Sequence, residues 1–370
     1  MKKDRSYQKI ILFLKELGLN DSEINKVITF FKDHYNTEEN VYPKMISTTK
    51  MLLDYGFSKE EIKIIAKEFH ALYAYNTEFL KERLSKFERI GYSKDQIKKM
   101  MRRCPPIFRT SDEKIEERKQ LLNKIGFSNK DFITMTYKNP YIFIRGEEQL
   151  TANLSYLSQI GVSLEEGKII FRKFPHIIGM DSSYISDKLN FLIKTGFKKE
   201  TILSMIKISP SILAYSESSI MERLNTVQSL GFTYEEAINI YSISRGLFTT
   251  RPEDIILKMN CIIAAGYNID EARIIIKKYP AILSLNIDSI KDKLEYYNEI
   301  GLHDIIVRAP KNLIQSKLLS EARYNYFKRN GLTIDETNYK RLFMGEKQFV
   351  KQFNKTKEEL LEESKVYIKK

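Results

Sequence analysis

The chain has 370 residues, of which 42% are hydrophobic and 29% are charged, and this hydrophobic content excludes a wholly disordered protein. Lysine and arginine total 61 against 48 aspartates and glutamates, which gives a net charge of +13 at pH 7. A surplus of this size suggests a polyanionic partner but does not say which one.

Cysteine content, histidine spacing and hydropathy exclude further classes of protein. The two cysteines, Cys104 and Cys261, are too few for a disulfide framework or a cysteine-based zinc site. The four histidines lie far apart in the sequence, so we predict neither a metal site nor a cofactor. No apolar run approaches the roughly 20 residues of a membrane-spanning helix, and we predict no membrane association.

Residues 1–55 are predicted to form an N-terminal cap and an imperfect first repeat, because Gly18 and Gly56 are 38 residues apart. Residues 56–300 then divide into seven units of 35 residues, each of which begins with a glycine. These glycines are Gly56, Gly91, Gly126, Gly161, Gly196, Gly231 and Gly266, and Gly301 begins the next unit. A fixed period of this length is the sequence signature of a solenoid, in which each repeat packs on its neighbours.

Each unit begins with a predicted helix. A good N-cap residue stands two residues after the glycine in six of the seven units, and Lys198 stands there in the other. The six caps are Ser58, Ser93, Ser128, Ser163, Thr233 and Asn268. A proline 14 residues after the glycine stops the helix, because the residue before a proline is pushed out of the α region. The prolines are Pro105, Pro140, Pro175, Pro210 and Pro280, while His70 and Arg245 replace them in two units.

A short apolar segment and a second predicted helix complete the unit. The third position of the segment is aliphatic in six units: Ile107, Ile142, Ile177, Ile212, Leu247 and Ile282. The second helix follows a cap residue, which is Asn76, Ser111, Gly146, Asp181, Ser216 or Asn286. It ends at the next glycine, which adopts a left-handed C-cap at least cost. Strand-like alternation is not sustained, so the predicted fold is all-α.

The C-terminal part of the chain departs from the period. Residues 301–330 are predicted to be a shortened repeat, since Pro310 arrives early and Gly331 follows Gly301 after 30 residues. Residues 331–370 are predicted to form a C-terminal cap that ends in a charged helical tail. Atypical terminal units are expected in a solenoid, because they close the core against water.

The unit resembles the repeat of the mitochondrial transcription termination factor (mTERF) family. The resemblance is carried by stretches such as Ile125-Gly126-Phe127-Ser128 with Pro140-Tyr141-Ile142-Phe143, and Thr195-Gly196-Phe197 with Pro210-Ser211-Ile212-Leu213. It covers about residues 18–330. It implies a superhelical solenoid of about nine 35-residue helix–helix–3₁₀ repeats. Family members bind nucleic acid, mostly duplex DNA in organelles, and act in transcription termination, genome maintenance, RNA processing or ribosome assembly.

Basic residues recur at fixed positions of the unit. We call the residues 27 positions after the glycine the +27 column, and six of its seven members are basic, the exception being Asn153. The basic members are Arg83, Arg118, Lys188, Arg223, Lys258 and Lys293. In a solenoid, equal phase means equal direction, so we predict a line of positive charge that follows a phosphate backbone. The alternative is a solvated flank, or long side-chain stems that cover the edge of the core.

A second basic column, the +11 column, lies near the end of the first helix. It contains Lys67, Arg102, Arg172, Lys207 and Lys277, and Arg103 lies beside it in the most basic stretch of the chain. The +7 column, one turn earlier, contains Lys63, Lys98, Lys168 and Arg273. Basic residues near a helix C-terminus also complement the helix macrodipole. The +11 column therefore either contacts nucleic acid or only stabilises its own helices. Which basic column faces a ligand is also open at this point.

The sequence therefore favours a non-catalytic nucleic-acid-binding protein. We expect a monomer that binds double-stranded DNA, with the transcription machinery as a further partner. RNA, including ribosomal RNA, is the alternative ligand, and a protein-binding scaffold is the alternative class. No phosphate-binding loop, nucleophile elbow or metal-ligand motif predicts an enzyme. No transit peptide is recognisable at the start, so we expect a bacterial-type cytoplasm, with a mitochondrial or plastid matrix as the alternative.

Overall fold

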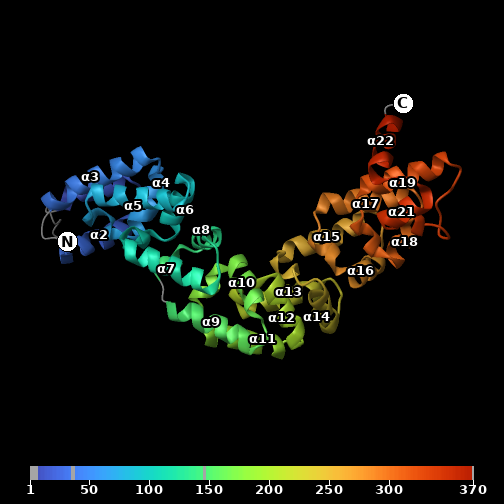
Figure 1. Ribbon diagram of the computed structural model, residues 1–370, viewed down its shortest axis with the longest axis horizontal. Helices are drawn as coiled ribbons and strands as arrows, with labels where there is room; N and C mark the ends of the chain where they lie inside the picture. Colours follow the sequence, from blue (N-terminus) through green and yellow to red (C-terminus); the bar gives the residue numbers. More distant parts are fainter. Residues whose placement is uncertain (1–6, 35–37, 145–146, 369–370) are drawn as a thin grey trace. The chain divides into compact units, whose positions relative to one another are not determined.

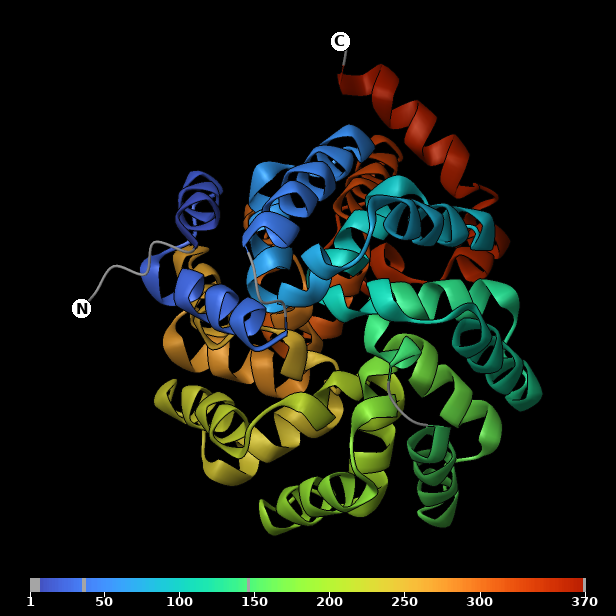
Figure 2. The same ribbon diagram turned by 90° about the vertical axis from the view of Figure 1, so that its left-hand side faces the viewer.

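The computed structural model describes residues 7–34, 38–144 and 147–368. Within these ranges all regular secondary structure is helical, as both ribbon views show (Figures 1 and 2). The predicted all-α solenoid of helix–helix–3₁₀ repeats is confirmed. The chain forms two compact units, Met1–Ile185 and Ser186–Lys370, which we call the N-terminal and C-terminal units.

The N-terminal unit opens with three helices, α1 (Gln8–Glu16), α2 (Asp21–His34) and α3 (Glu38–Tyr55). Its regular repeats have the first helices α4 (Lys59–Glu68), α6 (Lys94–Arg103), α8 (Asn129–Lys138) and α10 (Leu164–Lys173). The 3₁₀ segments are η2 (His70–Ala74), η3 (Pro105–Arg109), η4 (Pro140–Phe143) and η5 (Pro175–Gly179). The second helices are α5 (Thr77–Ile90), α7 (Asp112–Ile125) and α9 (Glu147–Gln159), and α11 (Ser182–Lys194) spans the division between the two units.

The C-terminal unit repeats the same order. Its first helices are α12 (Lys199–Ile208), α14 (Tyr234–Ile243), α16 (Ile269–Lys278) and α18 (His303–Arg308). The 3₁₀ segments are η6 (Pro210–Ala214), η7 (Leu247–Thr249), η8 (Pro280–Ser284) and η9 (Pro310–Ile314). The second helices are α13 (Glu217–Ser229), α15 (Pro252–Ala264), α17 (Ile287–Glu299) and α19 (Lys317–Arg329). The chain ends with α20 (Lys340–Phe343), α21 (Glu346–Phe353) and α22 (Lys357–Ile368), which packs on α19 (Figure 1).

The residues at the helix starts explain why the elements begin where they do. All six predicted Ser, Thr and Asn caps of the first helices form a reciprocal capping box with the residue three positions later. Such a cap stabilises a helix by about 1 kcal/mol. Lys198 makes no side-chain cap bond. Among the second helices, Asn76, Ser111, Ser216 and Asn286 accept backbone N–H groups, whereas Gly146 lies outside the described residues.

The repeated glycine is required for two reasons, which Gly231 illustrates. Its φ of 89° lies in the left-handed region, where a side chain is strained. In addition, a Cβ on Gly231 would lie 2.0 Å from the Nη2 atom of Arg273, which comes from the first helix of the next repeat. Gly231 therefore both begins its own repeat with a tight turn and makes room for a side chain of the repeat after it.

The hydrophobic core contains the apolar residues that recur at the same position of successive repeats. Ile107, Ile177, Ile212 and Ile282 behind the proline position are at most 1% exposed. Consecutive 3₁₀ segments contact one another from η3 to η5 and from η6 to η8, so the ends of neighbouring first helices are adjacent. Where the proline is replaced by Arg245, the 3₁₀ segment η7 has only three residues. No helix in the part of the chain described above is long and apolar enough to span a bilayer.

Candidate nucleic-acid interface

The +27 column lies inside the repeats. Arg118, Lys188, Arg223 and Lys293 are at most 9% exposed, and Asn153 in the same phase is fully buried. Burial lowers the pKa of Lys188, of Lys258 and of Lys293, because an ammonium group loses hydration there. These side chains therefore do not form a solvent-facing line.

The buried donors of the +27 column bind backbone carbonyl groups of the following repeat. Lys188 Nζ donates to Tyr215 O over 2.7 Å, Lys258 Nζ donates to Leu283 O over 2.6 Å, and Lys293 Nζ donates to Leu313 O over 2.7 Å. Arg223 Nε donates to Phe248 O over 3.1 Å, and Asn153 Nδ2 donates to Ile177 O over 2.6 Å. All of these acceptors lie in or directly after a 3₁₀ segment. These five side chains thus clamp their second helices to the next repeat.

Two further members of this phase also contact the next repeat. Arg83 forms an ion pair with Asp112, and Arg323 of the shortened repeat donates to Leu342 O and Met344 O. The predicted phosphate contacts of Arg83, Arg118, Lys188, Arg223, Lys258 and Lys293 conflict with this placement. The physical reason is that equal phase fixes a common direction, and here that direction is towards the next repeat.

The +11 column is largely engaged in ion pairs between repeats. Lys67 Nζ lies 2.8 Å from Glu23 Oε1, Arg172 Nε lies 2.8 Å from Asp131 Oδ1, and Lys277 Nζ lies 2.5 Å from Glu236 Oε1. Each carboxylate also caps the first helix of the preceding repeat. Such exposed pairs are weak, because water and salt screen the two charges. Lys207 is half-buried, whereas Arg102 is exposed and makes no hydrogen bond or ion pair within the described ranges.

The +7 column reaches the glycine turn of the preceding repeat. Lys98 Nζ donates to Gly56 O over 3.2 Å, and Arg273 Nε donates to Leu230 O over 3.0 Å. These carbonyl groups end a second helix, where the macrodipole favours a cation. The +7 column therefore has a structural role as well.

Exposed cations remain at the ends of the first helices. The final two residues of α6, α8 and α10 include five basic side chains, which we call the helix-end row: Arg102, Arg103, Lys138, Arg172 and Lys173. All except the half-buried Arg172 are exposed. Arg102, Arg103 and Arg172 were predicted from the sequence, whereas Lys138 and Lys173 were not; the signal for them is the recurrence of basic residues 12 positions after the glycine.

The helix-end row is continuous within the N-terminal unit. Arg103 Nη1 donates to Tyr137 O over 3.3 Å, and Lys138 Nζ donates to Arg172 O over 3.0 Å. A guanidinium group has five N–H donors and an ammonium group three, so each side chain keeps donors for another acceptor. The Arg103 guanidinium also lies 5.5 Å from the centre of the Tyr137 ring. The row thus presents adjacent, positioned cations with unused donors.

The corresponding positions of the C-terminal unit differ. Ile208 and Ile243 occupy the ends of α12 and α14 and are 46% and 55% exposed. Lys278 and Arg308 restore the charge at the ends of α16 and α18, and Lys278 Nζ donates to Arg308 O over 3.2 Å. Two apolar side chains therefore interrupt the basic positions of this unit.

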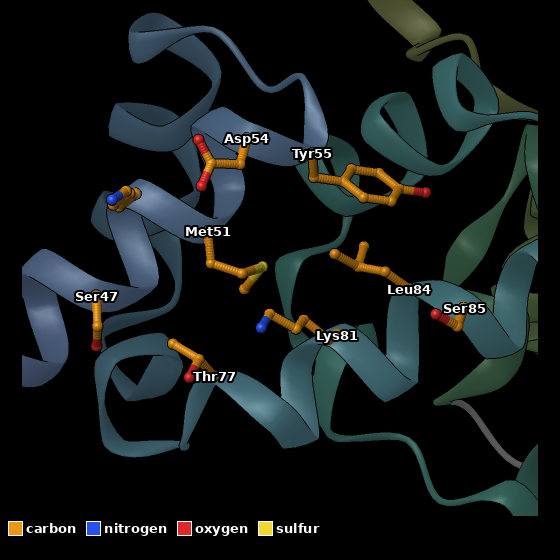
Figure 3. A pocket seen from close by; sticks show the side chains of 9 residues that line it. Ser47, Met51, Asp54, Tyr55, Thr77, Lys81, Leu84 and Ser85 are labelled. Carbon is orange, nitrogen blue, oxygen red and sulfur yellow. The ribbon is translucent and has the colours of Figure 1, made fainter.

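A hollow of about 470 Å³ between α3 and α5 offers no catalytic grouping (Figure 3). Met51 and Leu84 supply its apolar lining, and Lys81 at its edge is paired with Glu78 over 2.8 Å. The hydroxyl group of Tyr55 donates a hydrogen bond to Glu88. Its lining residues contain neither histidine nor cysteine.

The mTERF family model matches residues 1–88, 80–195 and 180–350 of the chain. A search of curated proteins gave no match.

Proposed function

The chain belongs to the mTERF family of nucleic-acid-binding helical-repeat proteins, and we propose that it binds double-stranded DNA through the helix-end row of its N-terminal unit. Its role would lie in transcription or genome maintenance. Phosphate contacts would supply most of the affinity, because each cation that meets a phosphate releases condensed counterions.

One observation carries this assignment of the surface. The helix-end row places four exposed cations on three consecutive repeats, and Arg103 and Lys138 keep N–H donors after their contacts between repeats. Lys138 uses one of its three N–H donors on Arg172 O, and Arg103 uses one of five on Tyr137 O. The side chains are thus held in place yet can still bind phosphate oxygens, which reduces the entropy lost on binding.

The proposal is tested by measuring the affinity for a fluorescent DNA duplex across a salt series. Replacing Arg102, Lys138 and Lys173 by glutamine is expected to weaken binding and to reduce the slope of log K against log salt by about three. The matched control replaces Lys59, Lys94 and Lys130, which are exposed at the opposite ends of the first helices.

The two triple variants carry the same net charge, so a difference between them locates the contact. Equal weakening by both variants would mean that only total charge matters and would remove the helix-end row from the proposal. Parallel titrations with double-stranded RNA and single-stranded DNA decide the ligand. Tighter binding of either one would overturn the assignment to duplex DNA.

A further inference from the structure

Three side chains able to coordinate a metal ion converge where α16 meets α18 in the C-terminal unit. Glu271, His303 and Asp304 each offer one ligand atom, and these atoms lie within 4.8 Å of one another. His303 Nε2 is 3.2 Å from Glu271 Oε1. The nucleic-acid proposal uses none of these residues, so the inference stands independently of it.

The hydrogen bonds around His303 determine which ring nitrogen carries hydrogen. Asn298 Nδ2 donates to Ala265 O over 2.5 Å, which turns the amide oxygen of Asn298 towards His303. That oxygen lies 3.2 Å from His303 Nδ1 and can only accept, so Nδ1 must be the donor. In the neutral ring, the lone pair of Nε2 then faces a carboxylate oxygen of Glu271, which also only accepts.

The contact between Nε2 and Glu271 therefore requires a positive charge. Elsewhere, a carboxylate in the phase of Glu271 pairs with a Lys or Arg of the +11 column, as Glu236 does with Lys277. The shortened repeat lacks that cation, because Val307 stands three residues before Pro310. No Lys or Arg within the described residues pairs with Glu271 or Asp304. With a neutral imidazole, the cluster carries a formal charge of −2.

Tyr267 supplies a second, independent observation. Its ring stacks on that of His303, with centroids 4.2 Å apart and planes at 11°. Its hydroxyl group is buried without a hydrogen-bond partner, which is unfavourable for a polar group. Burial first, and then the negative charges of Glu271 and Asp304, raise the pKa of Tyr267. A buried polar group near the cluster is thus left unsatisfied by the chain itself.

We propose that Glu271, His303 and Asp304 bind a zinc ion, which joins the first helix α16 to the shortened helix α18. An imidazole nitrogen with carboxylate oxygens is a ligand set that suits Zn²⁺, whereas Mg²⁺ prefers oxygen ligands. The two charges of the ion balance the two carboxylates. Asn298 holds the Nδ1 side of the ring and Tyr267 its face, which is the outer-shell support that zinc-binding histidines receive.

The test is calorimetric titration of the metal-free full chain with Zn²⁺ and, separately, with Mg²⁺. We expect one zinc site of micromolar affinity or better, a higher melting temperature with zinc, and no comparable effect of Mg²⁺. His303→Gln and Asp304→Asn are each expected to weaken zinc binding at least tenfold. Asp304→Asn leaves the His303–Glu271 contact intact, so it keeps the test valid if the histidine variant folds poorly. His34→Gln is the control, because His34 is exposed and its Nδ1 atom contacts Phe30 O, outside the cluster.

X-ray absorption spectroscopy at the zinc edge should show that the ion is coordinated by one imidazole nitrogen and by oxygen atoms. Failure of the full chain to bind zinc would overturn the metal proposal. Zinc binding that survives both His303→Gln and Asp304→Asn would place the ion elsewhere and would overturn it equally.

Discussion

The guanidinium group of Arg273 occupies the space beside Gly231 that a Cβ atom would need. Its Nη2 atom lies 2.0 Å from the position of that Cβ, and its Nε atom donates to Leu230 O over 3.0 Å. The turn after the second helix α13 and the middle of the first helix α16 are thus fitted to each other. A glycine at this position is part of the contact between repeats as well as a turn residue.

Gly231→Ala is expected to destabilise the protein more than Gly161→Ala. Both glycines have positive φ, which costs an alanine about 1–2 kcal/mol, but a Cβ on Gly161 would meet nothing within 4 Å. The additional loss at Gly231 reflects displacement of Arg273 from Leu230 O. Urea denaturation of both variants measures the difference, and adding Arg273→Ala to both should remove it. Equal losses in the two single variants would contradict the fitted contact.

Lys258→Met should lower the free energy of unfolding by about 1–3 kcal/mol, because it leaves the carbonyl group of Leu283 buried without its donor. Lys291→Met is the matched control, since the Lys291 side chain is 60% exposed and only weakly paired. Thermal unfolding followed by circular dichroism checks the prediction. An unchanged melting temperature together with a large loss of DNA affinity would return the +27 column to the candidate interface.

Acid should weaken the ion pairs between repeats. The hydrogen bond from Lys277 first, and then that from the backbone of Thr233, lowers the pKa of Glu236. Because the folded-state pKa is the lower one, this carboxylate stabilises the fold above its unfolded pKa of about 4.5, and the contribution is lost as pH falls through the folded value. Melting temperatures between pH 3 and pH 7 should therefore fall less steeply for Glu236→Gln than for the natural protein. Glu235→Gln, one residue away, should follow the natural curve.

Introducing lysines at Ile208 and Ile243 should strengthen DNA binding. These exposed side chains occupy the phase that holds Arg103, Lys138 and Lys173 in the other unit. The double variant is expected to bind duplex DNA more tightly at low salt and to increase the salt slope by up to two. Ile256→Lys with Leu257→Lys adds the same charge on α15 and serves as the control. An equal gain in both double variants would indicate attraction by net charge alone.

The sequence predicted the fold in detail because its signals are local. Gly231 marks a left-handed turn, Ser58 a helix start and Pro210 a helix end, and each acts through the backbone of its own neighbourhood. Arg245 was the one replacement of proline by a charged residue, and the structure shows its effect as the shortened segment η7. A period that repeats such signals seven times leaves little room for another fold.

The candidate site was less predictable. Periodicity places Lys188 and Lys258 on a common line, but it does not say whether the line faces solvent or the next repeat. That depends on the carbonyl groups opposite, such as Tyr215 O, and hence on packing. The cluster at His303 could not be predicted from the sequence for a related reason. The shortened helix α18 shifts the phase, so that Glu271 meets a residue 32 positions later and no regular spacing reveals the pair.

The clamps of the +27 column each reach forward by a single repeat and no further. When the chain is pulled by its termini, these junctions would therefore break one at a time, and no single rupture would release the whole array. A force–extension trace is expected to show many small steps, with early yielding where Arg251 leaves α15 without a side-chain cap. Mechanical compliance of this kind would let the protein lengthen and recoil along a filamentous ligand without losing its tertiary structure elsewhere.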